Sequence, residues 1–330
     1  MINKRIIAIT AVLAFSLNAL SAQGRFEYGG DLAGGARNGT SSAVSLLIPQ
    51  GAAYLSGGGA VATATGVGAA YWNPAGMARA ANNLETTFSQ RSHFADMSVM
   101  FAGAAVKLGK NSFGISVRSL DVGEIPVTTV FAPDGTGEKF SPSNFTAGLT
   151  FSRMMSAKTS MGVTVNTTSE GFRRVKGTAM TVDAGVQYMD FLNVSGLDVG
   201  VAVRNFGRPM RYEGSGLLTK AVEVGTDRLT QFLKVEPAEF DVPMLFEIGM
   251  AYDVMPGFQV AGTYESNNFE QDKTKLMASY SLPGLLTVRG GFLFEMETVE
   301  RTDDSRTTTV DAVSYTHLRA HETLRYLVCR

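Results

Sequence analysis

Apolar and polar residues alternate along most of this chain, in segments of about ten residues that begin near Leu84. In the stretch 145–152, Phe145, Leu149 and Phe151 fall on one face of an extended chain. Thr146 and Thr150 fall on the other face, because successive side chains of a β-strand point to opposite sides. We count about a dozen such segments, at 84–91, 97–107, 112–120, 144–153, 159–168, 179–189, 196–206, 243–254, 258–266, 273–281, 285–296 and from about 306 onward.

Short and long connections alternate between these segments. Short turns stand at 109–111, 156–158, 193–195, 256–257 and 283–284, whereas the links 121–143, 207–242 and 297–305 are long. Strands of about 9–11 residues with short turns at one end and long loops at the other are typical of an antiparallel transmembrane outer-membrane β-barrel. A soluble β-sandwich or β-solenoid would also show alternation, but the strand lengths and the loop pattern favour the barrel.

The first 22 residues have the pattern of a cleaved signal peptide. Lys4 and Arg5 precede an apolar run over 6–17, and small residues follow up to Ala22. That run is shorter than the roughly 20 residues of a transmembrane helix, and no later run is long enough. We therefore expect an exported protein in the outer membrane of a Gram-negative bacterium, in contact with outer-membrane lipid. The charged fraction of 18%, below the roughly 25% of typical globular proteins, suits this location.

Residues 23–83 lack the alternation and predict a separate N-terminal segment. Small residues dominate 52–70, which indicates a backbone packed closely in a confined space. The run 57–62 superficially fits a dinucleotide-binding fingerprint, but no strand precedes it and no βαβ unit surrounds it.

The stretch GAAYWNPAGM, at 68–77, contains the only tryptophan and predicts a rigid turn. Proline fixes its own backbone and favours an extended residue before it, and a following glycine can take a positive φ or begin a helix. The neighbouring tyrosine and tryptophan are large anchors whose polar atoms need partners. We interpret this set as a structural motif, with direct ligand contact as the alternative: Tyr71, Trp72, Asn73, Pro74 and Gly76.

The longer stretch GAAYWNPAGMARA, at 68–80, resembles the N-terminal motif of the PorV/PorQ family, relatives of FadL-type outer-membrane proteins. The likeness continues at 182–188 and 205–210, and in a loop at 125–137 whose motif residues are Thr128, Thr129, Asp134, Gly135 and Gly137. The resemblance implies a FadL-like barrel of 14 strands, of which about 12 would be present over 84–312. It also implies that residues 23–83 plug the barrel lumen.

Residues 313–330 differ from the rest of the chain and hold two of the three histidines and the only cysteine. Their first part, VSYTHLRAHE, resembles a translated sequencing adapter, since GTC TCT TAT ACA CAT CTC CGA GCC CAC GAG encodes it. The later LVCR fits the adapter sequence that follows a variable index. We interpret 313–330 as an artefact and the barrel as incomplete, with a natural chain that is longer. Without the tail and the leader, acidic residues outnumber basic ones, so nucleic-acid binding is not indicated.

No catalytic, cofactor-binding or metal-binding set emerges, and we do not expect an enzyme. His93 stands alone between strands and is expected to be a polar loop residue. Acidic residues at Glu295, Glu297, Glu300, Asp303 and Asp304 could attract calcium, but such loops are usually solvated. The segment 213–242 is long for a plain connection, and either an amphipathic lid or a flexible surface loop would fit it.

Two functions compete. Resemblance to PorV/PorQ implies a non-enzymatic component of type IX-like protein secretion and surface attachment, which binds secretion-apparatus or cargo proteins through its outer loops. The alternative is a FadL-like transporter that passes a hydrophobic small molecule across the outer membrane.

Overall fold

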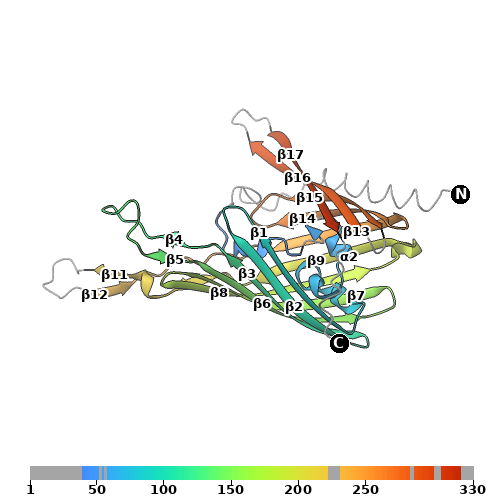
Figure 1. Cartoon of the computed structure of the whole chain (residues 1–330), viewed down its shortest axis with the longest axis horizontal. Helices are drawn as coiled ribbons and strands as arrows, with labels where there is room; N and C mark the ends of the chain where they lie inside the picture. Colours follow the sequence, from blue (N-terminus) through green and yellow to red (C-terminus); the bar gives the residue numbers. More distant parts are fainter. Residues whose placement is uncertain are drawn as a thin grey trace.

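A computed structural model describes residues 39–51, 54–55, 58–221, 231–282, 286–300 and 306–320, and the predicted signal peptide at 1–22 lies outside these ranges. The described chain forms a 13-stranded antiparallel sheet in which neighbours along the main path are also neighbours in sequence (Figure 1). The main path consists of β1 (Leu84–Ser92), β2 (Ser98–Leu108), β3 (Asn111–Asp121), β6 (Ser143–Met154), β7 (Thr159–Phe172), β8 (Val175–Tyr188), β9 (Leu197–Gly207), β13 (Leu245–Met255), β14 (Phe258–Asn267), β15 (Lys273–Leu282), β16 (Leu286–Glu300) and β17 (Arg306–Ala320). A short strand, β10 (Arg211–Glu213), pairs with β8 beside this path.

Every segment with predicted alternation is a strand of this sheet, so the predicted antiparallel all-β fold is confirmed. One connection differs from the sequence prediction. The bounds 159–168 and 179–189 imply a longer link, but β7 and β8 continue beyond them and meet at a turn of Arg173 and Arg174. The extension is polar on both faces, around Ser169 and Glu170, so it carries no alternation to detect. The strict alternation of short and long connections is therefore wrong at this hairpin.

Two small hairpins project from the end of the sheet that carries the long connections, here named the loop end (Figure 1). The connection between β3 and β6 contains β4 (Ile125–Pro126) paired with β5 (Lys139–Phe140). The connection between β9 and β13 contains η7 (Ser215–Leu217) and the pair β11 (Leu218–Ala221) and β12 (Gln231–Lys234). Its described parts form a hairpin, and 222–230 lie outside the described residues, so the amphipathic lid and the flexible surface loop both stay predictions. The opposite end, which carries the short turns, is named the turn end.

Strands β1 and β17 are the two edges of the sheet, and no pairing joins them in the described ranges. The backbone of β17 crosses the predicted adapter boundary after Ala312 and pairs with β16 as far as Ala320. The adapter interpretation concerns the gene sequence and stays a prediction. The expected total of 14 strands also stays a prediction. Within the described ranges, no helix has the length and apolar character to cross a membrane.

The two faces of the sheet have the reverse polarity of a water-soluble β-protein. Outward side chains are apolar and exposed, with Leu149 at 66% and Ile115 at 58%. Inward side chains are polar and buried, including Thr150, Thr164 and Gln187. A broad exposed apolar face is unfavourable in water and favourable against lipid. The sheet is therefore the wall of a transmembrane outer-membrane β-barrel.

The described residues of 42–80, here named the plug, lie within the curve of this wall (Figure 1). Residues 23–38 of the predicted N-terminal segment 23–83 lie outside the described residues. The plug forms short helical turns: η2 (Val44–Leu47), α2 (Ala60–Thr63), η4 (Gly66–Gly68), α3 (Ala69–Trp72) and η5 (Pro74–Arg79). The plug touches each strand of the main path from β1 to β16, for example through Gly66 at Glu85 of β1, Val61 at Gly200 of β9 and Tyr54 at Arg289 of β16. The wall is thus wrapped around the plug.

Candidate functional site

Asn73 holds the plug to the wall through its side-chain amide. Its backbone is extended, as the following proline predicts (φ −159°, ψ 107°), and Pro74 begins η5. The Asn73 Nδ2 donates to the carbonyl of Val61 at 2.8 Å within the plug and to Val186 of β8 at 3.1 Å, and the carbonyl of Val201 in β9 lies 3.3 Å away. The Asn73 Oδ1 accepts from the Ala75 N–H at 3.1 Å, which caps η5. One buried amide therefore fixes both the turn and its position on two strands.

Glycines of the wall let the plug backbone come close. A side chain on Gly162 of β7 would overlap the carbonyl group of Pro74, and one on Gly200 of β9 would overlap that of Val61. Both glycines occupy inward positions, where any β-carbon would displace the plug. The small residues that were predicted to pack in a confined space also approach the wall closely. A β-carbon on Gly59 of the plug would overlap the side chain of Ala261 in β14.

Tyr71 and Trp72 connect the turn to the plug residues that precede it. Their rings meet edge to face, with centroids 4.9 Å apart. The Tyr71 hydroxyl donates to the carbonyl of Leu46 at 3.3 Å, and the Trp72 Nε1 donates to that of Gln50 at 3.1 Å. Both polar atoms have the partners that the sequence analysis required. The hydrogen bond from Trp72 joins it to the plug, and its ring centroid also lies 5.7 Å from the guanidinium of Arg204, on the wall strand β9.

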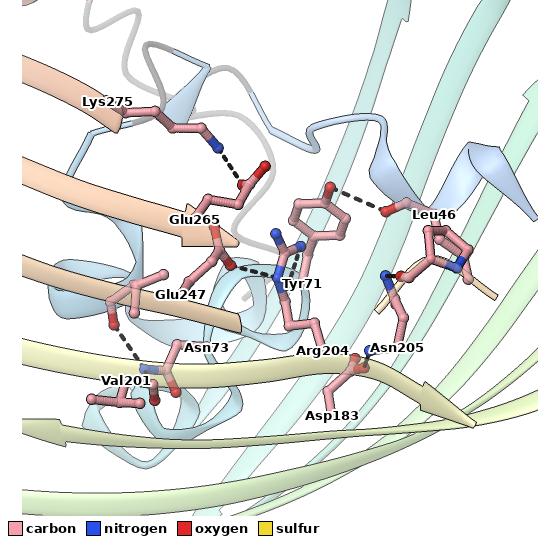
Figure 2. A network of polar contacts seen from close by, with 12 residues as sticks. Leu46, Tyr71, Asn73, Asp183, Val201, Arg204, Asn205, Glu247, Glu265 and Lys275 are labelled. Carbon is pink, nitrogen blue, oxygen red and sulfur yellow. Dashed lines mark hydrogen bonds and ion pairs between the residues drawn. The ribbon is translucent and has the colours of Figure 1, made fainter. Parts of the chain in front are cut away.

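A network of buried charges surrounds Tyr71 (Figure 2). The guanidinium of Arg204, on β9, lies 4.7 Å from the Tyr71 ring centroid, donates from Nη1 to the Tyr71 carbonyl at 3.3 Å, and donates from Nε to Glu247 of β13 at 2.7 Å. A second pair follows, in which Lys275 of β15 donates to Glu265 of β14 at 2.5 Å. The charges balance within this group, as buried ions require.

A backbone irregularity adds Asp183 of β8 to the same region (Figure 2). The pairing of β8 with β9 shifts beside Asp183, and Asn205 adopts φ 58° in the left-handed region. The Asp183 carboxylate accepts from the Asn205 N–H at 2.6 Å and from Asn166 Nδ2 at 2.7 Å. Asn205 belongs to a stretch that carries the family resemblance, and here it bends the wall next to the charge network.

The turn end of the plug is held by polar contacts. Ser152 of β6 accepts from the Ala78 N–H and donates to the Ala75 carbonyl, both at 3.0 Å. Arg79 donates to Gln187 at 3.0 Å. Lys107 of β2 donates to the carbonyl of Ala80 at 2.8 Å, where the plug leads into β1.

The loop end of the plug is held by a second set of contacts, here named the outer clasp: Ser42, Ala43 and Ser45 of the plug with Asn144, Glu170, Tyr212, Phe240 and Asp241 of the wall and its connections. An apolar cluster of Ala43, Leu46, Ala179, Met210 and Val242 lies beneath it. Burial and the hydrogen bond to Glu170 raise the pKa of Tyr212, so its hydroxyl stays a donor.

A cavity of 970 Å³ opens at the turn end between β13 and β16. One part of its lining is apolar, with Val194, Tyr252, Val254, Met255 and Pro256. The other part is polar and includes Gln259, Ser279, Thr287 and Arg289. Arg289 also lies 5.6 Å from the ring centroid of Tyr54, which places the cavity beside the plug.

The predicted loop motif lies apart from the plug, in the link between β4 and β5 (Figure 1). Thr129 and Ala132 exchange backbone hydrogen bonds, Gly135 and Gly137 have positive φ, and Thr128 and Asp134 are exposed. The motif shapes a turn whose tip carries Val130 and Phe131, 94% and 99% exposed.

Among the described residues, the remaining sequence candidates form no site. His93 lies in a loop against Phe94, with ring centroids 4.8 Å apart. In the described ranges no group of three His, Cys, Asp or Glu side chains could hold a metal, and Glu295 pairs with Lys273 at 3.3 Å. Asp303 and Asp304 lie outside the described residues, as do the side chains of Glu297 and Glu300.

No protein-family model matches the sequence, and no curated protein shows significant similarity to it. Several solved structures are similar in fold. The TodX monoaromatic hydrocarbon channel deltaS2 mutant has a TM-score of 0.46 at 15% identity, over 74% of this chain and 82% of that one. The CymD monoaromatic hydrocarbon channel has a TM-score of 0.46 at 13% identity, over 76% and 84%. The toluene transporter TodX of Pseudomonas putida has a TM-score of 0.39 at 10% identity, over 76% and 93%. These channels are of the FadL type, whereas the finer resemblance to PorV/PorQ stays a prediction.

Proposed function

We propose that this chain is a plugged outer-membrane barrel that transports small molecules, and that displacement of the plug opens its lumen. The observation that carries the proposal is how the interior is filled. Side chains of the wall can fill the interior of a small barrel, but a wider barrel encloses a lumen that must be left open or plugged. Here wall glycines such as Gly162 and Gly200 make room, and a separate segment occupies the space.

The way in which the plug is held supports a movable element. Part of the contact between plug and wall is polar, and it includes hydrogen bonds from Asn73, Ser152 and Gln187 to backbone groups. Water can replace such hydrogen bonds when the plug moves, so their net contribution to stability is about 1 kcal/mol each. A segment held in this way can leave its seat at a much smaller cost than a purely apolar core.

The cavity at the turn end indicates the class of solute. Its volume of 970 Å³ is within the usual range for small-molecule sites. The apolar side around Tyr252 and Met255 suits the hydrophobic ligand of the transporter hypothesis, and the polar side around Gln259 and Arg289 suits one hydrogen-bonding group. The proposed solute is a small molecule with an apolar body and a polar group.

A second function, in protein secretion and surface attachment, rests on the loop end. Val130 and Phe131 stand fully exposed at the tip of a long loop, away from the lipid-facing strands. Exposed apolar tips of this kind suit a protein partner. This feature favours binding of a protein partner but does not identify a secretion apparatus, so we rank the secretion function second.

Deletion of the gene separates the two functions. Transport predicts reduced uptake of small apolar solutes, which the intact gene restores, together with an unchanged set of surface proteins. Secretion predicts normal uptake and an altered set of surface proteins. Normal uptake of every solute tested would reject the transport proposal.

A further inference from the structure

The connection between β9 and β13 holds the first residues of the plug directly. The Ser42 N–H donates to the carbonyl of Asp241 at 2.9 Å, and the Ser42 hydroxyl donates to that of Phe240 at 3.0 Å. Phe240 in turn exchanges backbone hydrogen bonds with Met210, at the start of the same connection. Ser42 is therefore attached to one end of this long connection, and through Phe240 to its other end, rather than to the membrane-spanning wall alone.

Glu170 is the centre of this outer clasp. Its carboxylate accepts from Tyr212 OH at 2.8 Å, from Asn144 Nδ2 at 2.8 Å and from the Ala43 N–H at 3.3 Å. Charge-assisted hydrogen bonds of this kind are stronger than neutral ones. One carboxylate thus joins a residue of the connection, a residue of the wall and the plug.

The clasp is linked to the buried part of the plug through two aromatic residues. Tyr71 donates to Leu46, and Trp72 donates to Gln50, only a few residues after the clasp. Tyr71 also lies against Arg204 of the charge network. A movement of residues 42–50 would therefore break the hydrogen bonds that hold Tyr71 and Trp72 in place.

The same connection extends outward into the β11–β12 hairpin, where Phe232 is 63% exposed and Leu233 is 55% exposed. These residues are neighbours on a strand, so they face opposite sides of the hairpin. The connection therefore has an outer surface that can be contacted from outside and an inner end that holds the plug.

We propose that the outer clasp, at the inner ends of the β9–β13 connection, controls the plug, so that opening of the clasp releases the plug at the loop end while the turn-end anchors remain in place. The inference rests on the proposed function only in taking the plug as the gate. Coupling between the loop end and the buried part of the plug requires an element with two arrangements, and a change at either place must shift the equilibrium between them. The outer clasp, released or closed, is that element.

A buried thiol in the plug tests the coupling without any transport measurement. Val67 is 3% exposed and packs against Gly103 of β2, so Val67→Cys, in a Cys329→Ser background, places a near-isosteric thiol inside the barrel. Its rate of reaction with a small methanethiosulfonate reagent reports how often the plug opens. We expect Tyr212→Phe, which removes one hydroxyl, and Glu170→Ala to raise this rate about tenfold or more.

Two matched controls define the other outcomes. Glu236→Ala removes an ion pair with Arg211 on the same connection, 3.4 Å long, that does not touch the plug. Lys107→Met removes the contact with Ala80 at the turn end. Glu236→Ala should leave the labelling rate unchanged, and Lys107→Met should raise it less than either clasp variant. A rate raised equally by Lys107→Met, or raised by neither Tyr212→Phe nor Glu170→Ala, would overturn the proposal. Labelling as expected without any solute flux would instead reject the transport function and leave the coupling intact.

Discussion

The Arg204 guanidinium lies 2.7 Å from the Glu247 carboxylate and 4.7 Å from the Tyr71 ring, so one cation joins two wall strands to the plug. Both charged side chains are almost fully buried, at 3% and 1% exposure. Removal of one partner of a buried ion pair is far more costly than removal of both, because the remaining charge has no compensation. This relationship links the stability of the wall to the position of the plug.

Arg204→Met should destabilise the folded barrel by about 3–5 kcal/mol, because it leaves Glu247 without its partner. The double variant Arg204→Met/Glu247→Leu should recover most of that loss. Urea unfolding in detergent measures the free energy of unfolding of both variants, and the heat-dependent mobility shift of the folded barrel reports the folded fraction. Equal losses in the single and double variants would show that the pair does not act as a unit.

Gly162→Ala should displace the plug while the wall stays folded, because the new methyl group would overlap the Pro74 carbonyl. The expected result is faster proteolysis within residues 42–80 and an unchanged mobility shift of the barrel. Gly68→Ala is the matched control, since no atom lies within 4 Å of the position its methyl group would take. If the protease cuts the plug at the same rate in both variants, the result would contradict the close approach of β7 to the plug.

Leu149→Arg should disrupt insertion into the membrane. Leu149 is an outward residue at the middle of β6 and is 66% exposed, and an arginine at the bilayer midplane costs about 2–4 kcal/mol. Leu108→Arg, at the turn end of β2, should cost about 0–1 kcal/mol because it lies near the interface. Folding into liposomes compares the two. A soluble protein would tolerate both substitutions alike.

The wall could be predicted from the sequence because its signal is local. Alternation with a period of two needs no knowledge of partners, and Leu149 and Thr150 show their faces within a few residues. The polar extension at Ser169 was missed, since outside the membrane no apolar face is needed. The extended Asn73 was also predictable, because the proline that follows restricts it directly.

The interior contacts could not be predicted because they depend on register between distant strands. Glu247 and Glu265 stand directly opposite each other on β13 and β14, yet each looks like a single polar residue within its own strand. The only signal in the sequence was that both residues occupy positions on the inward face of their strands. Likewise, Leu46 and Gln50 offer backbone carbonyls to Tyr71 and Trp72, and a carbonyl acceptor leaves no mark in the sequence.

The most direct test of the plugged-barrel account is the conductance of the purified protein in a planar lipid bilayer, compared between the native sequence and Asn73→Ala. Asn73 donates to both the plug and β8, whereas the exposed Asn82 contributes only its backbone N–H, so Asn82→Ala is the control. We predict a mostly closed native protein, a closed control, and an Asn73→Ala variant that opens frequently. A folded Asn73→Ala barrel that stays as closed as the native protein would contradict the account.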